Sequence, residues 1–284
     1  MQPITKMRQL DLCSGVGAGF CYAGLQLGFS LVGTAETDGY CNDILFNRYP
    51  GVHNYGDVRS LAFDGGFGLK PGAIDIITAS PPCPPFSGEG LRLGASDSRD
   101  CFPSVLRIIN NYQPRFAAIE NVTGLLDCPT YPGEPAGSYF RGVLRTLDSI
   151  GYDAEWLTVG TGYVGGPFIR ERVLLVAVAR SIKLNWKGTT PWTDQARRRI
   201  EEIRLAAKKR GAEPGYPMSV VRNPANLARP LGVKSRNGII RKQRAAAGNM
   251  LDPRVASIAL SRILYLQSIA EQSNTREFLR GKHG

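Results

Sequence analysis

The chain has 284 residues, 43% of them hydrophobic, and a formal net charge of +11. That length supports one core of about 200 residues plus a smaller module, and no apolar run approaches the roughly 20 residues of a membrane-spanning helix. Six cysteines without a CxxC pair, after a start at Met1–Lys6 that lacks an apolar signal region, lead us to expect reduced thiols in a cytosolic protein.

Along the chain, short apolar runs alternate with helical patterns. We expect strands at residues 7–13, 31–36, 73–79, 115–120 and 172–179. We expect helices from a Gly-rich turn to about residue 27, and at residues 40–49, 139–150 and 252–268. This alternation predicts an α/β fold with buried parallel strands. In such folds ligands bind beyond the carboxyl ends of the strands.

The first predicted strand is followed by a Gly-rich turn. Gly15, Gly17 and Gly19 open a helix, and Glu36 ends the second strand. Backbone amides in such a turn can approach a ligand, and an acid about 20 residues later can bind ribose hydroxyls. Asp57 supplies a further polar side chain that could contact an adenine. The set indicates an adenosyl ligand without a pyrophosphate; tight-turn glycines without a ligand are the alternative.

Cys83 lies in the segment Ser-Pro-Pro-Cys-Pro-Pro-Phe-Ser, where four prolines restrict φ around one thiol. It follows the apolar run 73–79, so the thiol is expected just past the carboxyl end of a strand. A buried free cysteine is the alternative. The two histidines, His53 and His283, leave little material for a Cys–His hydrolase or a His-based zinc site.

Positive charge is concentrated in residues 181–244. This segment holds 16 Lys and Arg against 4 Asp and Glu, a net charge of +12, so the other 220 residues sum to −1. A basic module in a near-neutral body indicates a polyanionic partner, most simply nucleic acid. A basic surface kept only for solubility would spread the charge more evenly.

Two parts of this segment carry the expected nucleic-acid contacts. Residues 194–210 have the pattern of an amphipathic helix capped by Thr193, with Arg197, Arg198 and Arg199 toward phosphates. A solvated helix packed on the body is the alternative. Residues 214–238 are expected to be loops able to enter a groove. The basic residues assigned to substrate binding are Arg197, Arg222, Arg229 and Arg236.

The order of these motifs resembles that of the DNA cytosine-5 methyltransferases along nearly the full chain outside the basic segment. Residues 11–20 resemble the family's S-adenosylmethionine loop, Pro82-Cys83 its nucleophile motif, and residues 86–99 its mobile catalytic loop. Glu120-Asn121-Val122, Arg170-Glu171-Arg172 and Gly248-Asn249-Met250 resemble the Glu-Asn-Val, Arg-x-Arg and late Gly-Asn motifs. Any one of these matches is weak, but six in family order are specific.

The resemblance implies a Rossmann-like S-adenosylmethionine-dependent methyltransferase domain, at residues 1–180 and 245–284, with a small basic target-recognition domain at residues 181–244. It implies methyl transfer to carbon 5 of a flipped-out cytosine, with S-adenosylhomocysteine as product. The expected partner is double-stranded DNA, without a membrane or a metal. We expect a monomer, cytoplasmic and nucleoid-associated, from a bacterium or a phage.

Roles follow from the resemblance residue by residue. Cys83 would add to carbon 6, with a pKa lowered by positive surroundings; Glu120 would share a proton with ring nitrogen 3; and Arg172 would hold the base's carbonyl oxygen. Arg170 and Asn121 complete the catalytic set. The cofactor set is Asp11, Cys13, Gly15, Gly17, Gly19, Glu36, Thr37, Asp57, Val58, Pro82, Asn249 and Met250. Ser87 and Arg99, at the two ends of a lid with Gly88, Gly90 and Gly94 as hinges, join the substrate set.

The chain departs from the family pattern at three positions. Cys13 stands where an aromatic usually lies near the adenine, Pro84 where a glutamine follows the nucleophile, and Phe168 where a glutamine precedes the Arg-x-Arg motif. Three alternatives stay open: a tRNA cytosine-5 methyltransferase on the same fold, a catalytically inactive DNA-binding regulator, and a Cys–His hydrolase.

Overall fold

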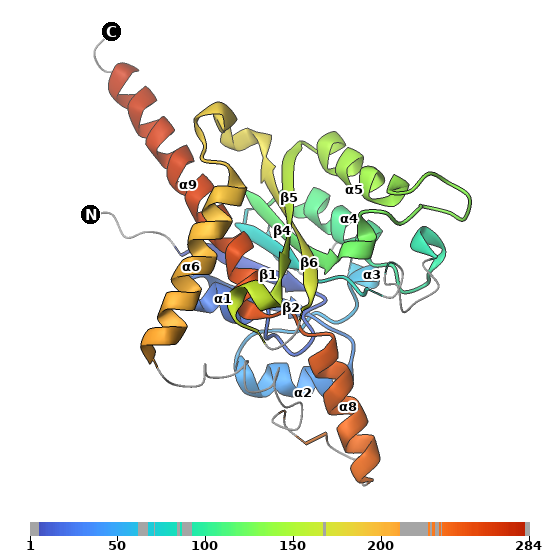
Figure 1. Ribbon diagram of the computed structural model, residues 1–284. Helices are drawn as coiled ribbons and strands as arrows, with labels where there is room; N and C mark the ends of the chain where they lie inside the picture. The colour runs from blue at the N-terminus through green and yellow to red at the C-terminus, as the bar shows by residue number, and fades with distance from the viewer. Residues whose placement is uncertain are drawn as a thin grey trace.

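The computed structural model of the chain is built around one mixed sheet covered by helices on both faces (Figure 1). It describes residues 6–61, 68–70, 72–83, 86, 93–166, 169–210, 227, 229–230, 233 and 235–281. For residues 209–210 and 274–281, the ends of two helices, only the backbone is described. Within these residues no helix is both long and apolar enough to cross a membrane.

The sheet has the strand order β2-β1-β3-β4-β6-β5. Its strands are β1 (Arg8–Leu12), β2 (Ser30–Ala35), β3 (Ile76–Ala79), β4 (Phe116–Val122), β5 (Tyr152–Gly160) and β6 (Glu171–Ala179). The first four run parallel, and β6 runs antiparallel to both β4 and β5. The α/β fold expected from the sequence is confirmed.

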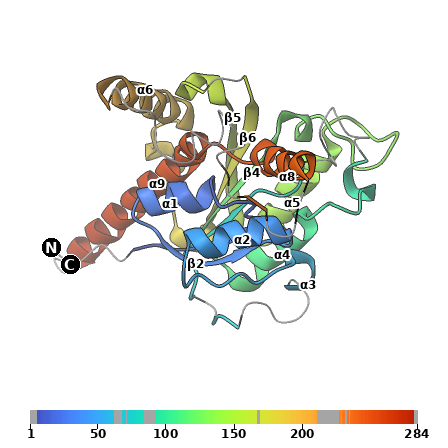
Figure 2. The same ribbon diagram turned by 90° about the horizontal axis from the view of Figure 1, so that it is seen from below.

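Helices cover both faces of the sheet (Figures 1 and 2). They are α1 (Phe20–Gln26), α2 (Gly39–Arg48), α3 (Val58–Leu61), α4 (Phe102–Tyr112), α5 (Ser138–Ser149), α6 (Trp192–Arg210), α8 (Arg236–Gly248) and α9 (Pro253–Gly281). One apolar core joins α4 and α5 to the sheet, and the other joins α1 and α9 to its opposite face. Strands β1, β3 and β4 have nearly every residue buried because both faces are covered.

Several elements differ from the sequence-based expectations. Strand β5 and helices α4 and α8 were not expected. Helix α6 begins at Trp192, so Thr193 lies inside it and is not its cap. Residues 236–238, expected to end a loop, form the first turn of α8, because the Ser235 hydroxyl accepts a hydrogen bond from Gly238 N at 3.1 Å.

The start of the basic segment is joined to the body. Trp192 and Ala196 of α6 are buried in the core that contains α9. Arg262 of α9 is buried; it forms an ion pair with Glu155 of β5 at 2.5 Å and donates to Gln195 Oε1 of α6 at 2.6 Å. Helix α8 also crosses residues 244 and 245. The division into domains at residues 180 and 245 stays a prediction.

Candidate active site

A cavity of about 970 Å³ opens at the carboxyl edge of the sheet, where β1, β3 and β4 end. Its lining includes five residues predicted to bind cofactor and four predicted to be catalytic: Cys13, Gly15, Glu36, Pro82 and Asn249, and Cys83, Glu120, Arg170 and Arg172. The antiparallel direction of β6 explains how the arginines reach this edge. Arg172 is the second residue of β6 and pairs in register with Val122 at the end of β4, so it lies beside Glu120.

The segment that carries Cys83 is held by backbone and amide contacts. Ser80 N donates to Leu12 O at 3.1 Å. Asn121 is buried, and its Nδ2 donates to Pro81 O at 3.1 Å, while its Oδ1 accepts from Val122 N at 2.9 Å. Asn121 does not line the cavity, so its contribution in this structure is to position the backbone next to the thiol.

The expected lowering of the Cys83 pKa is wrong for this structure. Burial raises the pKa of the thiol to about 11, and the nearby Glu120 carboxylate adds to the rise. Arg172 and Arg170 act in the opposite direction, but they do not outweigh burial. The thiol is therefore protonated at neutral pH until the surroundings of the site change.

Glu120 and Arg172 form a buried ion pair. Arg172 Nε lies 2.7 Å from Glu120 Oε1, and the two side chains are 10% and 5% exposed. Nε is buried and its N–H is not aligned on that oxygen, so the contact is described as an ion pair. Burial raises the pKa of Glu120, while Arg172, Arg170 and a hydrogen bond from the Ser80 hydroxyl oppose the rise. The Glu120 carboxyl group therefore holds its proton more readily than usual, even beside the buried guanidinium of Arg172.

The Gly-rich turn is held in shape by Glu36. The Glu36 carboxylate accepts from Gly15 N at 2.7 Å with one oxygen, and from Thr37 N and Asp38 N at 2.8 and 2.9 Å with the other. Gly17 has a φ of 67°, and a Cβ there would lie 2.5 Å from the Tyr49 ring, so glycine is required. The turn and the acid expected 20 residues later are therefore one unit.

Other predicted cofactor residues lie outside the cavity lining. The Asp11 carboxylate is buried, accepts from Thr78 Oγ1 at 2.5 Å and from Cys21 Sγ at 3.0 Å, and has a pKa raised to about 6 by burial. Asp57 is paired with Arg59 at 2.7 Å. Gly17, Gly19, Val58 and Met250 are buried, and Thr37 is exposed. Cys13 lines the cavity with a left-handed φ of 54°, unusual for a residue other than glycine.

The predicted substrate residues are not gathered at the cavity. Arg99 is paired with Asp97 at 2.7 Å, and Arg197, 82% exposed, lies 3.5 Å from Asp194. Arg229 and Arg236 are exposed. Ser87, Arg222 and the departure positions Pro84 and Phe168 lie outside the described residues, as do Gly88 and Gly90 of the expected lid. At its far end Gly94, with a φ of 52°, packs so closely on Pro129 O that a Cβ would come within 2.5 Å.

The structure adds residues that sequence reasoning missed. Ser80, Thr123, Gly124 and Lys242 line the cavity. Ser80 and Thr123-Gly124 directly flank the Pro-Pro-Cys and Glu-Asn-Val motifs, so proximity in sequence could have indicated them. Lys242 has no such signal, because it reaches the cavity only through the packing of α8.

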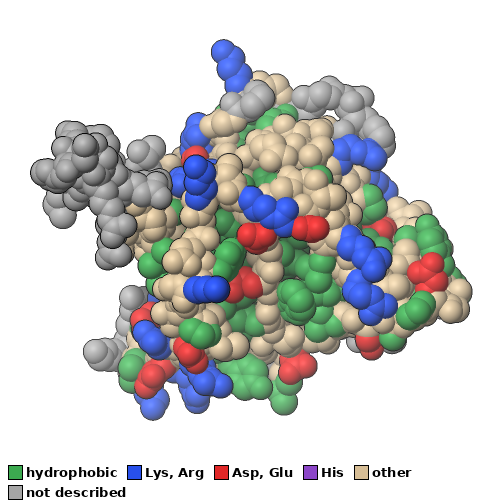
Figure 3. Space-filling model, turned by 90° about the horizontal axis from the view of Figure 1, so that it is seen from above, with side chains coloured by type: hydrophobic (Ala, Val, Ile, Leu, Met, Phe, Trp, Pro, Cys, Tyr) green, Lys and Arg blue, Asp and Glu red, His purple; other side chains and the backbone are tan. Residues whose placement is uncertain are grey.

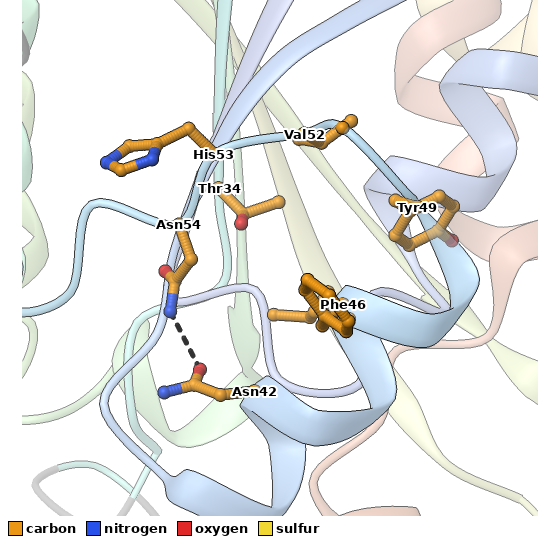
Figure 4. A pocket seen from close by; sticks show the side chains of 9 residues that line it. Thr34, Asn42, Phe46, Tyr49, Val52, His53 and Asn54 are labelled. Atoms are coloured by element: carbon orange, nitrogen blue, oxygen red, sulfur yellow. Dashed lines mark hydrogen bonds between the residues drawn. The ribbon is translucent and has the colours of Figure 1, made fainter.

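A second cavity, of about 310 Å³, lies at the β2 edge (Figure 4). Asn54 Nδ2 donates to Asn42 Oδ1 there at 2.9 Å, and the His53 ring points away from Phe46 and Tyr49. His53 meets Tyr55 edge-on, with ring centroids 4.5 Å apart. It lines this cavity and not that of Cys83, so the one histidine among the described residues is not placed as a Cys–His hydrolase would need; His283 lies outside the described residues. No metal-binding group of three or more His, Cys, Asp or Glu occurs in the part of the chain that is described.

Comparisons with known proteins agree with this geometry. Residues 7–221 match the C-5 cytosine-specific DNA methylase family. The chain is 32% identical over 187 residues to the Type II methyltransferase M.NgoMIV of Neisseria gonorrhoeae, covering 66% of the chain and 56% of the relative. It is 36% identical over 172 residues to the Type II methyltransferase M.AplI of Arthrospira platensis, covering 59% and 44%. The chain spans about half the length of these relatives.

Solved structures show the same likeness. A structure described as a DNA modification methyltransferase encoded within an E. coli prophage matches with a TM-score of 0.50 and 27% identity, over 63% of the chain and 49% of its own. A variant of Spodoptera frugiperda DNMT2 matches with a TM-score of 0.58 over 90% of the chain and 99% of its own. At 15% identity, that second match concerns the fold alone.

Proposed function

Because the chain belongs to the C-5 cytosine-specific DNA methylase family, we propose that it transfers a methyl group from S-adenosylmethionine to carbon 5 of a cytosine in DNA. The observation that carries the proposal is that one cavity contains both the Gly15–Glu36 unit and the Cys83–Glu120–Arg172 cluster. A methyl donor and a base bound in this cavity would therefore lie at the same edge of the sheet, next to each other.

The residues at one end of the cavity fit an adenosyl cofactor. Gly15 presents backbone at the cavity wall, Glu36 supplies carboxylate oxygens, and Asn249 supplies an amide. We propose that these groups, with Pro82 and Cys13, hold S-adenosylmethionine, which supplies an electrophilic methyl group when bound. The turn glycines, Asp11 and Met250 would support this site from outside its lining.

The other end fits a cytosine ring. Arg172 brings the N–H donors of a buried guanidinium, suited to the carbonyl oxygen of a base, and Glu120 brings a carboxyl group suited to ring nitrogen 3 and the exocyclic amine. These atoms of the base are unreachable in a stacked duplex, so the proposal includes extrusion of the nucleotide, at a cost of a few kcal/mol.

The chain's own residues would activate the cytosine by a transient bond to its carbon 6. Cys83 loses its proton to solvent, and its sulfur bonds to carbon 6 as the 5,6 double bond opens. Glu120 gives its proton to ring nitrogen 3, and carbon 5 becomes nucleophilic. After carbon 5 has gained the methyl group, it loses its proton to solvent, the sulfur departs as a thiolate, the 5,6 double bond returns, and ring nitrogen 3 gives its proton back to Glu120.

The test uses Cys83→Ser, with Cys128→Ser as control, since Cys128 is buried away from the cavity. We expect wild type and control to methylate unmethylated genomic DNA, read by bisulfite sequencing, and Cys83→Ser to be inactive while still binding S-adenosylhomocysteine. Wild type should also form a covalent complex with duplex DNA carrying 5-fluorocytosine, because loss of the carbon 5 substituent is blocked. A serine variant that methylates at a comparable rate would show that the adduct is not formed on Cys83.

A further inference from the structure

Helix α8 is a strongly basic element fixed at the mouth of the active-site cavity. Its sequence, Arg-Asn-Gly-Ile-Ile-Arg-Lys-Gln-Arg-Ala-Ala-Ala-Gly, contains four arginines and lysines and no acidic residue. All four are exposed, and no described carboxylate lies within ion-pair distance of them. The positive charge of α8 is therefore not neutralised by the described part of the chain.

The helix is held firmly against the cofactor end of the site. Ala246, Ala247 and Met250 pack on Val16 and Ala18 of the Gly-rich turn and on residues of α2, and Figure 2 shows α2 and α8 side by side. The buried Gln243 side chain donates to Leu227 O at 2.7 Å. Arg170 donates to Gly248 O at the end of α8. A charged surface held this way is preorganised for a ligand.

The four cations do not share one face. Lys242, Ala245, Ala246 and Asn249 line the cavity, with the three- and four-residue spacing of one helix face. Arg241 lies one turn before Ala245, at the border of that face. Arg244 is two positions from Lys242 and therefore points to another side. We define the α8 basic face as Arg241 and Lys242.

Helix α6 is less suited than α8 to bind phosphates beside the cavity, although α6 is longer and contains more arginines and lysines. Its Arg199 is paired with Glu202 at 3.1 Å, its Arg197 lies 3.5 Å from Asp194, and it packs on α9. None of the side chains described in α6, residues 192–208, lines the cavity. On the opposite side of the molecule from α8, described acidic and basic side chains lie next to one another (Figure 3). Neither region concentrates unpaired positive charge beside the reacting groups.

We infer that the α8 basic face, Arg241 and Lys242, binds the phosphates that flank the extruded cytosine, and so anchors double-stranded DNA at the mouth of the cavity. This inference rests on the proposed function, which requires a nucleotide in that cavity. Extrusion leaves the phosphates of the target nucleotide at the cavity mouth, where two unpaired cations can hold them without reading the base.

The test is a salt titration of binding to a short labelled DNA duplex in the presence of S-adenosylhomocysteine. Each phosphate that the protein no longer neutralises should reduce the slope of log affinity against log salt by about 0.9. The double variant Arg241→Gln/Lys242→Gln should therefore lower the slope by about 1.8, so that a fourfold rise in salt weakens wild type about tenfold more than the variant. Arg244→Gln, on the same helix with the same charge change per residue, should leave the slope nearly unchanged.

The remaining outcomes are decisive. An unchanged slope in the double variant, an equal reduction per charge in Arg244→Gln, or a larger reduction in Arg197→Gln/Arg198→Gln/Arg199→Gln overturns the assignment to the α8 basic face. Displacement of the duplex by equimolar tRNA, with the same dependence on Arg241 and Lys242, overturns the choice of DNA. A wild type that binds with the expected slopes but does not methylate overturns the proposed function and keeps only the binding of DNA phosphates by the α8 basic face, and one that does not bind the duplex overturns both.

Discussion

Removing Arg172 tests how the buried ion pair is balanced. Both side chains are nearly inaccessible to solvent, and Arg172 is first among the charges that lower the pKa of Glu120 against the effect of burial. In Arg172→Gln the carboxylate keeps its desolvation penalty and loses its partner. Breaking a buried pair from one side costs about 3–5 kcal/mol of unfolding free energy. We expect a decrease in that range at pH 8.

The cost should depend on pH in a defined direction. The folded-state pKa of Glu120 is already raised, and removal of Arg172 raises it further, while the unfolded chain ionises near its usual value of about 4.3. Between those two values the folded state binds more protons than the unfolded state, so stability falls as pH rises. Arg172→Gln should therefore be less destabilised at pH 5 than at pH 8.

Urea unfolding at the two pH values, followed by circular dichroism, measures both effects. Arg172→Gln/Glu120→Gln removes both charges and should cost less than Arg172→Gln alone, because no buried charge is left unpaired. Arg180→Gln breaks exposed pairs with Asp148 and Asp153 and should cost about 0–1 kcal/mol. Equal destabilisation of Arg172→Gln at both pH values, or a double variant no more stable than the single one, would refute the reasoning.

Three further predictions follow from the site. Burial raises the pKa of Cys83 to about 11. Its alkylation by iodoacetamide at pH 8, mapped by mass spectrometry, should therefore be on the order of 100-fold slower than that of an ordinary thiol. The alkylation rate should keep rising above pH 9, and a plateau of that rate near pH 8.5 contradicts the prediction. Because the pKa of Asp11 is raised to about 6, the unfolding free energy of the wild type should fall by about 3 kcal/mol as pH rises from about 4 through 6. In urea unfolding, Asp11→Asn should lack that decrease. An equal decrease in the variant would show that Asp11 is not its source. Glu36→Ala should weaken S-adenosylhomocysteine binding by about 1–3 kcal/mol in calorimetry, and unchanged affinity would remove Glu36 from the cofactor site.

The elements that could be predicted are those whose pattern is local. Strands β1, β3 and β4 are continuous apolar runs, and the turn at Gly15–Gly19 has its own residue signature. Strand β5 was missed because it is an edge strand whose residues 153–158 are all half-buried or exposed, so no buried apolar run marks it. Helix α8 was missed because its polar, glycine-containing start resembles a loop, and only its last turns pack on the Gly-rich turn and α2.

The same division applies to the site. Cys83, Glu120 and Arg172 could be named because each lies in a short motif, and the antiparallel pairing of β6 brings them to one edge. Lys242 could not, since its place depends on how a distant helix packs. The direction of the Cys83 pKa was also missed: the sequence contains the positive neighbours, but it does not give the depth of burial that outweighs them.

The reversed direction of β6 also decides where the basic segment begins. A parallel strand would have released the chain at the edge where β1, β3 and β4 end, but β6 begins there and releases it at the opposite edge. Helix α6, 19 residues and about 28 Å long, therefore runs back along α9 before the chain can reach α8 (Figure 1). In chimeras that exchange recognition segments with a relative, the junction should follow α6, because a junction at residue 180 would separate Trp192 and Gln195 from the surface on which they pack.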